Sequence, residues 1–296
     1  MPNIGFIGLG NMGAPMAANL LKSGDHVVGF DVIAAARQAS AQLGVEIASS
    51  AKASVEGADI VITMLPAGEH VRAVWTEILP AAKRGALFID CSTIDVTSAR
   101  AAHGLAAERG IASLDAPVSG GVAGAKAATL TFMVGGTAEA FARGKPVLER
   151  MGKRVVHCGD AGNGQAAKIC NNMILGASMI AVSEAFVLGE KLGLSHQALF
   201  DVASASSGQC WSLTSYCPVP GPVPASPANN GYKPGFAAAL MLKDLKLARE
   251  AAQAVQARTA IGAHAAEIYD RYAAAGHSGS DFSGIINFVR EASKTG

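Results

Sequence analysis

Two side chains near the middle of the sequence have the types and the spacing needed to transfer a proton. Lys168 and Asn172 lie in the segment 162–172, Gly-Asn-Gly-Gln-Ala-Ala-Lys-Ile-Cys-Asn-Asn, where two glycines precede a predicted helix. Residues four apart share one helix face, so an ammonium group and an amide would point the same way. Beside a bound cofactor, this pair would move a proton and orient an oxygen. A solvated lysine next to an asparagine is the alternative, and other motifs must decide between the two.

A glycine-rich turn near the N-terminus predicts dinucleotide binding. An apolar run at residues 4–7 is typical of a buried parallel strand and leads directly into Gly8-Leu9-Gly10-Asn11-Met12-Gly13. A predicted helix to about residue 22 and a predicted strand at 26–30 follow, and Asp31 stands 18 positions after Gly13. In this order the motif is strong evidence, with the pyrophosphate expected at the helix N-terminus. A purely structural glycine turn is the alternative.

The residue that closes the second strand bears on the choice of dinucleotide. A carboxylate at the position of Asp31 accepts hydrogen bonds from both ribose hydroxyls of NAD and repels the 2′-phosphate of NADP. Arg37 lies a few residues further along and would soften this repulsion. We therefore expect NAD to be preferred over NADP.

Further ligand contacts are expected at the tips of later strands. Apolar runs at 60–65, 87–90 and 111–116 predict three more strands. Ligands of open α/β sheets lie at the carboxyl ends of the strands. We therefore expect the segment 65–70 to lie over the cofactor, and Thr93 to approach its nicotinamide end.

Two of these tips allow a structural explanation as well as a functional one. Either Ser92 or Thr93 could cap a helix that begins near residue 96, instead of contacting a ligand. After the third strand, Ser119 with Gly120 and Gly121 offers a hydroxyl and backbone N–H groups to a carboxylate. A plain loop would use the same residues, so the motif alone is moderate evidence.

The pattern predicts an α/β protein with two domains. Strands at about 129–134 and 154–158 complete a parallel sheet, so residues 1–161 form a Rossmann-type nucleotide-binding domain and residues 162–296 an all-α domain. The second domain starts with a continuous helical pattern over 164–192, which at 1.5 Å per residue spans about 45 Å and would join the two domains. Further helices are predicted at 195–205, 236–256, 260–274 and 282–292. Between them, the segment 217–235 holds six of the twelve prolines, so an ordered, extended and stiff loop is expected there.

Composition narrows the classes of function. The net charge is +1 and there is no basic stripe, so a nucleic-acid partner is not expected. The five cysteines show no paired spacing and are expected to be free thiols, and the seven histidines show no metal-ligand spacing. No signal peptide is recognised, and the most apolar run, 173–182, is short for a membrane span. A cytoplasmic protein with no membrane partner is expected.

Four motifs in this order resemble the β-hydroxyacid dehydrogenase family over essentially the whole chain. They are the glycine turn 8–13, Asp-Ala-Pro-Val-Ser-Gly-Gly at 115–121, the segment 162–168 with Asn172, and Lys-Asp-Leu at 243–245. The resemblance implies that Lys168 is the catalytic acid/base and that Asn172 orients both Lys168 and the substrate. It implies that Ser119, Gly120 and Gly121 bind the substrate carboxylate.

The same resemblance extends to the rest of the predicted site. It implies that Asp244 supports the site on the substrate side and that Lys243 closes over the cofactor. Leu65, Pro66, His70 and Thr93 fall on cofactor-contacting positions, with Gly8, Leu9, Gly10, Asn11, Met12, Gly13 and Asp31. Trp211, Tyr216 and Phe236 are expected to wall the carbon skeleton, with core packing as the alternative for Phe236. No metal is implied.

The resemblance implies oxidation of an alcohol to an aldehyde, with hydride passing to NAD. The expected substrate is 3-hydroxyisobutyrate, which gives methylmalonate semialdehyde in valine catabolism. L-serine, 3-hydroxypropionate or another short β-hydroxy acid is the alternative, because a pocket discriminates one methyl group by only about 1–3 kcal/mol. Gln209-Cys210-Trp211 departs from the Gly-Asn-Trp common in serine-oxidising relatives. Weaker alternatives are a non-catalytic binding module and an imine reductase. The Ala-rich helical domain suggests that the protein forms a dimer or tetramer.

Overall fold

The computed structural model describes residues 1–294, which form two compact units. The first is Met1–Lys168 and the second begins at Ile169, so the division falls inside the long helix α8 (Asn163–Lys191). This division reflects packing. The functional boundary between residues 161 and 162 stays a prediction.

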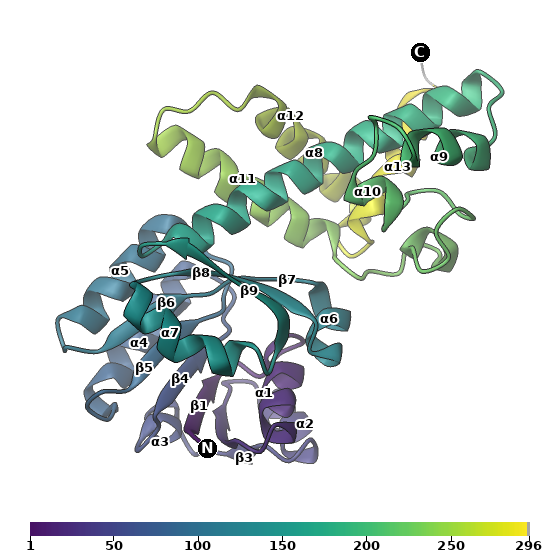
Figure 1. Ribbon diagram of the computed structural model, residues 1–296. Coiled ribbons are helices and arrows are strands. Elements are labelled where there is room, and N and C mark those ends of the chain that lie inside the picture. Colours follow the sequence, from purple (N-terminus) through teal and green to yellow (C-terminus); the bar gives the residue numbers. More distant parts are fainter. Residues whose placement is uncertain (295–296) are drawn as a thin grey trace. The chain divides into compact units, whose positions relative to one another are not determined.

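The first unit is built on one nine-stranded sheet of order β3-β2-β1-β4-β5-β6-β8-β7, with β9 paired to β8 (Figure 1). The strands are β1 (Asn3–Ile7), β2 (His26–Phe30), β3 (Glu46–Ile47), β4 (Ile60–Thr63), β5 (Leu87–Asp90), β6 (Ala112–Asp115), β7 (Val118–Ser119), β8 (Leu130–Gly135) and β9 (Gly152–Gly159). The six strands from β3 to β6 are parallel, which confirms the predicted Rossmann-type α/β fold. Strand β8 runs antiparallel to β6 and β7, so the far edge of the sheet is mixed.

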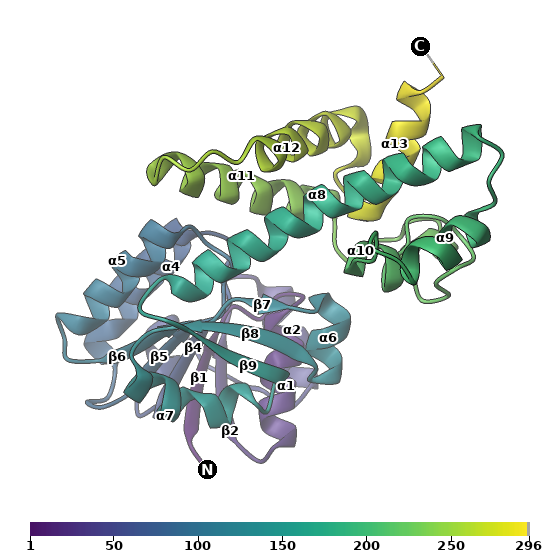
Figure 2. The same cartoon turned by 45° about the horizontal axis from the view of Figure 1, so that its top comes forward.

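Helices cover both faces of this sheet because the strand residues alternate between two apolar cores. Ile4, Phe6 and Ile62 pack in one core, and Ile7 and Val61 in the other. The first core receives α1 (Gly13–Lys22), α6 (Gly121–Ala127) and α7 (Ala138–Leu148). The second receives α3 (Ala51–Val55), α4 (Gly68–Ile78) and α5 (Val96–Ala107). Figure 2 shows α4 and α5 on the opposite side of the sheet from α1 and α6, and α2 (Ala34–Gln42) lies beside α1.

The strand register places one residue from each of five strands in a single row. Phe30 pairs with Ile7, Ile7 with Thr63, Thr63 with Asp90 and Asp90 with Asp115. Each of these residues is the last of its strand, so the segments that follow all leave from the same edge of the sheet. The predicted contacts of the first unit depend on this alignment.

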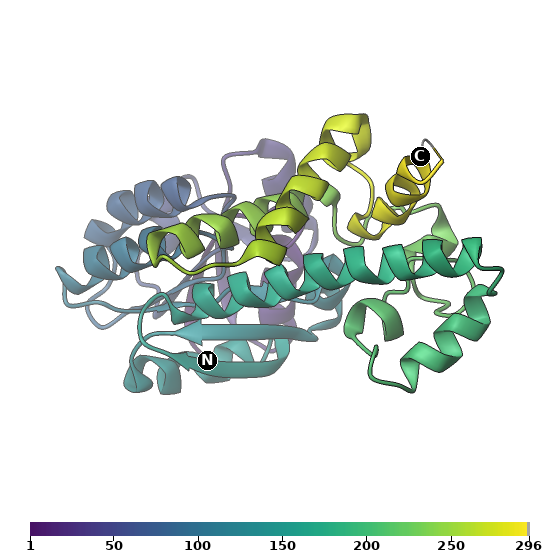
Figure 3. The same cartoon turned by 90° about the horizontal axis from the view of Figure 1, so that it is seen from above.

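The second unit is helical, as predicted. Besides the larger part of α8, it contains α9 (His196–Ser204), α10 (Trp211–Thr214), α11 (Ala238–Ala254), α12 (Ala260–Tyr272) and α13 (Ile285–Ala292), with short turns at η2 (Pro227–Asn230), η3 (Ala273–His277) and η4 (Phe282–Gly284). Met179 and Ile180 of α8 pack with α11 and α12, while Val182 and Phe186 pack toward α10. In Figure 3, α11 and α12 accordingly lie on the other side of α8 from the green helices α9 and α10.

Helix α8 ends where the sequence predicts. Gly193 has a φ of +80°, which a glycine adopts without strain, and the N–H of Leu194 donates to the carbonyl of Gly189. By length and composition α8 could cross a membrane, with 44% of its most apolar window buried inside the structure. The core helix of a soluble protein meets the same criterion, so this finding is weak evidence for a membrane span.

The proline-rich segment is folded back on itself, so the prediction of an extended loop is wrong. Side chains hold its two arms together: Ser226 Oγ donates to the carbonyl of Cys217 at 2.6 Å, and Asn229 Nδ2 to that of Val223 at 2.8 Å. Tyr232 adds a third bond from its hydroxyl to the carbonyl of Pro218 at 2.8 Å. Proline content predicted stiffness but carried no information about these bridging side chains.

Candidate active site

The glycine turn between β1 and α1 has the shape that a pyrophosphate requires. A Cβ at Gly8, whose φ is +96°, would lie 2.2 Å from the carbonyl oxygen of Met64, and a Cβ at Gly13 would lie 1.8 Å from that of Gly8. These two glycines let the turn close on β4 and let α1 pack against the turn. A Cβ at Gly10 would meet nothing within 4 Å, so this face of the turn is open. Because no side chain caps α1 at Met12, its N-terminal N–H groups suit an anionic ligand.

Asp31 is fixed at the end of β2 beside this turn. Its Oδ2 accepts from the N–H of Leu9 at 2.7 Å, and its Oδ1 accepts from the N–H of Ile33 at 2.8 Å. Each carboxylate oxygen keeps further acceptor capacity, which suits the two hydroxyls of a ribose. Arg37 lies close by, with Nη1 2.6 Å from the carbonyl oxygen of Asp31. These residues therefore fit a dinucleotide.

The tips of β4 and β5 are joined through Ser92. The Ser92 hydroxyl accepts from the N–H of Leu65 at 2.7 Å and donates to Asp90 Oδ1 at 2.6 Å. Asp95, not Ser92 or Thr93, caps α5 by accepting from the N–H of Ser98 at 2.7 Å, so the capping alternative is wrong. Asp95 is the capping residue because it lies directly before the first helical turn.

Asp90 is a buried carboxyl group behind these tips. Oδ1 accepts hydrogen bonds from Thr63 Oγ1 at 2.7 Å and from Ser92, whereas Oδ2 is buried without a hydrogen-bond partner among the described residues. Burial raises the pKa of Asp90 to about 6, although the hydrogen bonds from Ser92 and Thr63 oppose this. Below that pH the carboxyl group is protonated in the folded protein.

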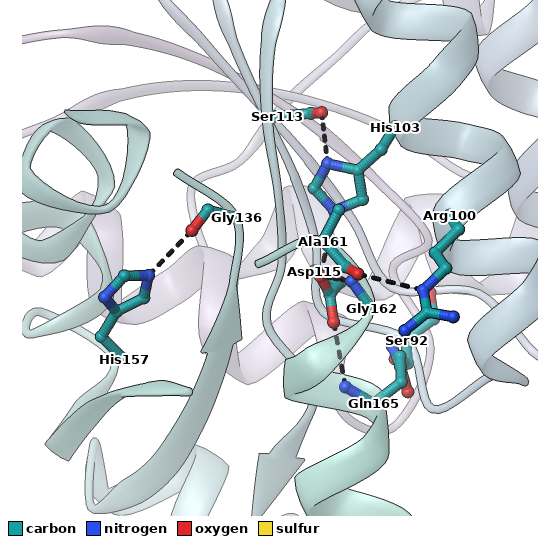
Figure 4. Close-up of polar contacts among 10 residues, drawn as sticks. All are labelled: Ser92, Arg100, His103, Ser113, Asp115, Gly136, His157, Ala161, Gly162 and Gln165. Carbon is teal, nitrogen blue, oxygen red and sulfur yellow. Dashed lines mark hydrogen bonds and ion pairs between the residues drawn. The ribbon is translucent and has the colours of Figure 1, made fainter. Parts of the chain in front are cut away.

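The first turn of α8, which leads to Lys168, is fastened to the tips of β5 and β6 (Figure 4). Asp115 accepts from the N–H of Gly162 at 2.8 Å and from that of Gln165 at 2.9 Å. The Gln165 side chain accepts from the N–H of Ile94 at 3.1 Å and donates to the carbonyl of Ser92 at 2.7 Å. Lys168 follows one turn later and is only 7% exposed, so the solvated alternative for this lysine is wrong.

Asn172 lies one turn beyond Lys168 in α8 and meets Asp244 of α11. Asn172 Nδ2 donates a hydrogen bond to Asp244 Oδ2, and Asn171 Nδ2 donates to Asn172 Oδ1 at 2.9 Å. Both Asn172 and Asp244 are buried, at 1% and 5% exposure. Lys243 is the preceding residue of α11 and is half-buried. The second unit thus brings together two predicted site residues that are 72 positions apart.

The three predicted aromatic residues form part of a stack that Asp281 holds in place. Trp211 stacks on Tyr216 with ring centroids 4.9 Å apart, and Phe282 contacts both Tyr216 and Phe236. Asp281 Oδ2 accepts from the Tyr216 hydroxyl at 2.9 Å and from the N–H of Phe236 at 3.1 Å. Burial, and then the charge of Asp281, raises the pKa of Tyr216 far above its ordinary value, so the hydroxyl is a permanent donor. Phe236 packs against the core of the second unit, as the structural alternative predicts.

The remaining predicted residues lie on loops and helix starts of the first unit. Ser119 ends β7 and is half-buried, and Gly120 (φ +132°) and Gly121 (φ +60°) turn the chain into α6. His70 is exposed in the first turn of α4, 3.9 Å from Glu69. Pro66 follows β4, and Thr93 lies between β5 and α5.

Sequence reasoning overlooked the residues that fasten α8. Asp115 and Gln165 stand inside recognised motifs, but no role was expected for them. His103 of α5 was not considered, although its Nε2 lies 3.0 Å from Asp115 Oδ1 and its Nδ1 2.8 Å from Ser113 Oγ. Asp115 could have been noticed in the sequence, because it is an aspartate at the end of a parallel strand. Ser113, His103 and Asp115 are in contact in the order of a catalytic triad. Ser113, however, is buried within β6, and the Asp115 carboxylate accepts from an N–H group at the start of α8.

No group of three or more histidine, cysteine or acidic side chains suited to a metal occurs within residues 1–294. In the same part of the chain all five cysteines are free, as predicted. A surface depression of about 430 Å³ lies in the second unit between Glu184, Lys191 and Arg271. None of the predicted site residues lines it.

A Rossmann-type sheet with an open glycine turn and a carboxylate at the end of the second strand is typical of dinucleotide-dependent oxidoreductases. Residues 3–159 match a family model described as the NAD binding domain of 6-phosphogluconate dehydrogenase. Residues 162–289 match one described as NAD-binding of NADP-dependent 3-hydroxyisobutyrate dehydrogenase. The chain belongs to the β-hydroxyacid dehydrogenase family and is an NAD-dependent hydroxyacid dehydrogenase.

Similar proteins carry two kinds of name. A solved structure described as 3-hydroxyisobutyrate dehydrogenase of Mycobacterium tuberculosis with L-serine is 56% identical, covers 98% of this chain and 99% of that one, and has a TM-score of 0.95. A 3-hydroxyisobutyrate dehydrogenase of Pseudomonas aeruginosa is 50% identical over 98% of this chain and 99% of its own. An NAD-dependent L-serine dehydrogenase of the same organism is 48% identical over 96% of both chains.

Proposed function

We propose that the chain oxidises 3-hydroxyisobutyrate to methylmalonate semialdehyde, as a step of valine catabolism. The names of the relatives at 56% and 50% identity support this substrate, and the name of the relative at 48% supports L-serine as the second candidate. The observation that carries the chemistry is the buried Lys168. It follows a fastened helix start and precedes Asn172 by one turn.

Lys168 is proposed to act as the general base in oxidation and as the general acid in reduction. An alcohol is a poor hydride donor until its proton leaves, and bound NAD supplies the hydride acceptor. The amine of Lys168 takes the hydroxyl proton in oxidation and returns it in reduction. Burial of this side chain and a fixed helix start restrict the positions that the amine can reach, which favours accurate proton transfer.

Asn172 and Asp244 are proposed to orient the reacting groups. Because Asn172 Nδ2 is engaged by Asp244 Oδ2, the asparagine amide cannot flip without losing a buried charge-assisted bond. This fixes the side of Asn172 that carries its oxygen. Lys243, next to Asp244, is proposed to close over the cofactor.

The substrate carboxylate is proposed to bind at Ser119, Gly120 and Gly121. The positive φ values of both glycines are those of a turn that exposes successive N–H groups, and α6 begins there without a side-chain cap. Trp211, Tyr216 and Phe236 are proposed to contact the carbon skeleton. Leu65, Pro66, His70 and Thr93 are proposed to contact the cofactor together with the glycine turn and Asp31.

We also propose the functional division into a cofactor domain (1–161) and a substrate and oligomerisation domain (162–296). Several large apolar side chains of the second unit are exposed, including Ile174 at 66% and Leu192 at 76%, which supports a dimer or tetramer. A cytoplasmic location, without nucleic-acid or membrane partners, is proposed from the balanced charge and the bacterial relatives. Light scattering of the purified protein tests the oligomeric state, and a monomer would contradict it.

The central experiment is Lys168→Ala. We expect kcat to fall by about 10²- to 10⁴-fold, since that is the usual contribution of a general acid/base, while the Kd for NAD changes little. Lys153→Ala, on the exposed part of β9, is the matched control and should keep full activity. Undiminished kcat in Lys168→Ala would refute the mechanism.

The substrate is tested by comparing kcat/KM for 3-hydroxyisobutyrate, L-serine and 3-hydroxypropionate. We expect the highest value for 3-hydroxyisobutyrate. A higher value for L-serine would leave the chemistry intact and transfer the proposed substrate to the second candidate.

A further inference from the structure

We infer that Asp115 is a positioning residue for Lys168, and that His103 holds Asp115 in place. This inference rests on the proposed role of Lys168 as the acid/base. It joins Asp115 to the start of α8, where Gly162 and Gln165 lie 47 and 50 positions further along the chain. No contact between Asp115 and a ligand is involved.

The carboxylate of Asp115 caps α8 from a neighbouring strand. Oδ1 accepts from the N–H of Gly162 and Oδ2 from that of Gln165, so two of the N–H groups that a helix leaves unpaired are bound by one charged group (Figure 4). The negative charge also opposes the positive end of the helix dipole. The side chain of Asp115 is only 2% exposed, so these bonds are shielded from water.

Glycines allow the backbone to close around this carboxylate. A Cβ on Gly135 would lie 2.4 Å from Asp115 Oδ1, and a Cβ on Gly164 would lie 2.8 Å from Oδ2 and 2.6 Å from the Asp115 carbonyl oxygen. All three distances are shorter than carbon and oxygen can approach without bonding. The second glycine of the segment 162–168 is therefore explained by the close approach of Asp115 and of the Met133 carbonyl oxygen, which lies 2.4 Å from such a Cβ, and any larger residue would push α8 away from the sheet.

His103 supplies the third bond to Asp115. Its Nε2 lies 3.0 Å from Oδ1 and donates to it, because an ionised carboxylate can only accept, while Nδ1 lies 2.8 Å from Ser113 Oγ. The carboxylate is thus approached by α5 on one side and by α8 on the other. Its two oxygens cannot rotate without breaking a bond to the start of α8.

The consequence for Lys168 follows from helix geometry. Gln165 and Lys168 are three residues apart, so they are neighbours on the surface of one helical turn. With the Gln165 N–H held by Asp115, and its side chain held by Ile94 and Ser92, the base of the Lys168 side chain has a fixed position relative to β5 and β6. A displacement of about 1 Å at a reacting group can cost about 10²-fold in rate.

The test is a double-mutant cycle between Asp115→Asn and Lys168→Ala. Asparagine has one acceptor oxygen in place of two, so it cannot hold both N–H groups. With Lys168 present, we expect Asp115→Asn to lower kcat by about 10- to 100-fold with the KM for NAD within about twofold. With Lys168 replaced by Ala, the same change should alter the residual kcat by less than about twofold, because no amine remains to be positioned.

Several outcomes would overturn the inference. An unchanged kcat in Asp115→Asn would do so, and so would equal losses in both backgrounds, which would show a general structural role. Thr137→Val removes the cap of α7, a helix that carries no predicted site residue, and serves as the matched control that should keep kcat. If Lys168→Ala keeps full activity, the proposed function fails; if it is inactive and Asp115→Asn is not impaired, only this inference fails.

A second variant keeps the test decisive if Asp115→Asn does not fold. His103→Gln leaves the carboxylate and both α8 bonds in place but removes the ring that orients Asp115. We expect a loss of kcat of about threefold to tenfold, again absent in the Lys168→Ala background. Equal loss in both backgrounds would refute the positioning role in this variant too.

Discussion

The amide nitrogen of Leu9 lies 2.7 Å from Oδ2 of Asp31, so one carboxylate both closes the glycine turn and faces the expected ribose. A charge-assisted bond of this kind fixes the carboxylate before any cofactor binds. With the proposed contact between Asp31 and the ribose, cofactor choice and the shape of the turn depend on a single side chain.

Asp31→Asn separates these two roles. Asparagine still offers one acceptor oxygen for the turn but loses the charge that repels a 2′-phosphate. We expect the ratio of kcat/KM for NAD over NADP to fall by about tenfold or more, equal to about 1.4 kcal/mol. Adding Arg37→Ala should remove part of the NADP gain, because this guanidinium is 2.6 Å from the Asp31 carbonyl. An unchanged ratio would contradict the prediction.

Gly8→Ala should lower the stability of the protein, whereas Gly10→Ala should weaken NAD binding. Alanine at Gly8 would place Cβ 2.2 Å from a backbone oxygen at a positive φ, so we expect a loss of at least about 2 kcal/mol in the free energy of unfolding. Alanine at Gly10 meets nothing within 4 Å, so stability should be kept while the Kd for NAD rises about tenfold or more. Thermal unfolding and NAD titration check both. Tight NAD binding by Gly10→Ala would show that the pyrophosphate lies elsewhere.

Asp90 should make the folded protein less stable as the pH rises from about 4 to 7. Its pKa is about 6 in the folded state against an ordinary 3.8, so the folded state binds the proton more tightly. The stabilisation is complete below the lower value and is lost as the pH rises through the higher one, a change of about 3 kcal/mol. Asp90→Asn should remove this loss, gaining stability relative to the wild type as the pH increases.

Asp59→Asn is the control for this measurement. Relative to the wild type, this variant should lose stability as the pH increases. Lys83 lowers the pKa of Asp59, so this carboxylate contributes stability above its ordinary pKa and loses it as the pH falls. Urea unfolding at a series of pH values measures both variants. Parallel pH curves for the wild type and Asp90→Asn would show that the carboxyl group titrates normally.

Exchanging Asn172 and Asp244 tests whether their hydrogen bond orients the site. Asn172→Asp alone would put two carboxylates in contact at a buried position, so we expect lower stability and a kcat reduced by about 10²-fold. Asn172→Asp with Asp244→Asn restores one amide and one carboxylate. The double variant should recover at least about tenfold of the lost kcat. Failure to recover would mean that each side chain acts separately.

Local patterns sufficed for much of the fold. Strands at 26–30 and 87–90 have the predicted bounds, because the apolar runs there end at polar residues. The reversed direction of β8 was not predictable, since an apolar run carries no direction. Helix α6 was missed because Gly-Val-Ala-Gly-Ala-Lys-Ala has no apolar periodicity.

The candidate site likewise has one part that local sequence predicts and another part that it does not. The one-turn spacing of Lys168 and Asn172 is local and was predictable, as was the glycine turn with Asp31. The bonds from Asp115 to α8, and from Asn172 to Asp244, join residues 47 to 72 positions apart. Sequence spacing alone says nothing about such pairs, because they depend on how strands and helices assemble.

Five strands of the sheet end in a single row. The sheet should therefore tolerate length changes less well at the C-terminal ends of these strands than in the turns that precede them. Removing one residue from β4 or β5 would turn every later side chain of that strand to the opposite face and withdraw its tip from the shared edge. The turns before these strands contain Gly57 and Gly85, where an added side chain would meet nothing within 4 Å. Insertions, affinity tags or fused domains therefore belong at these turns, and circular permutants should open the chain there.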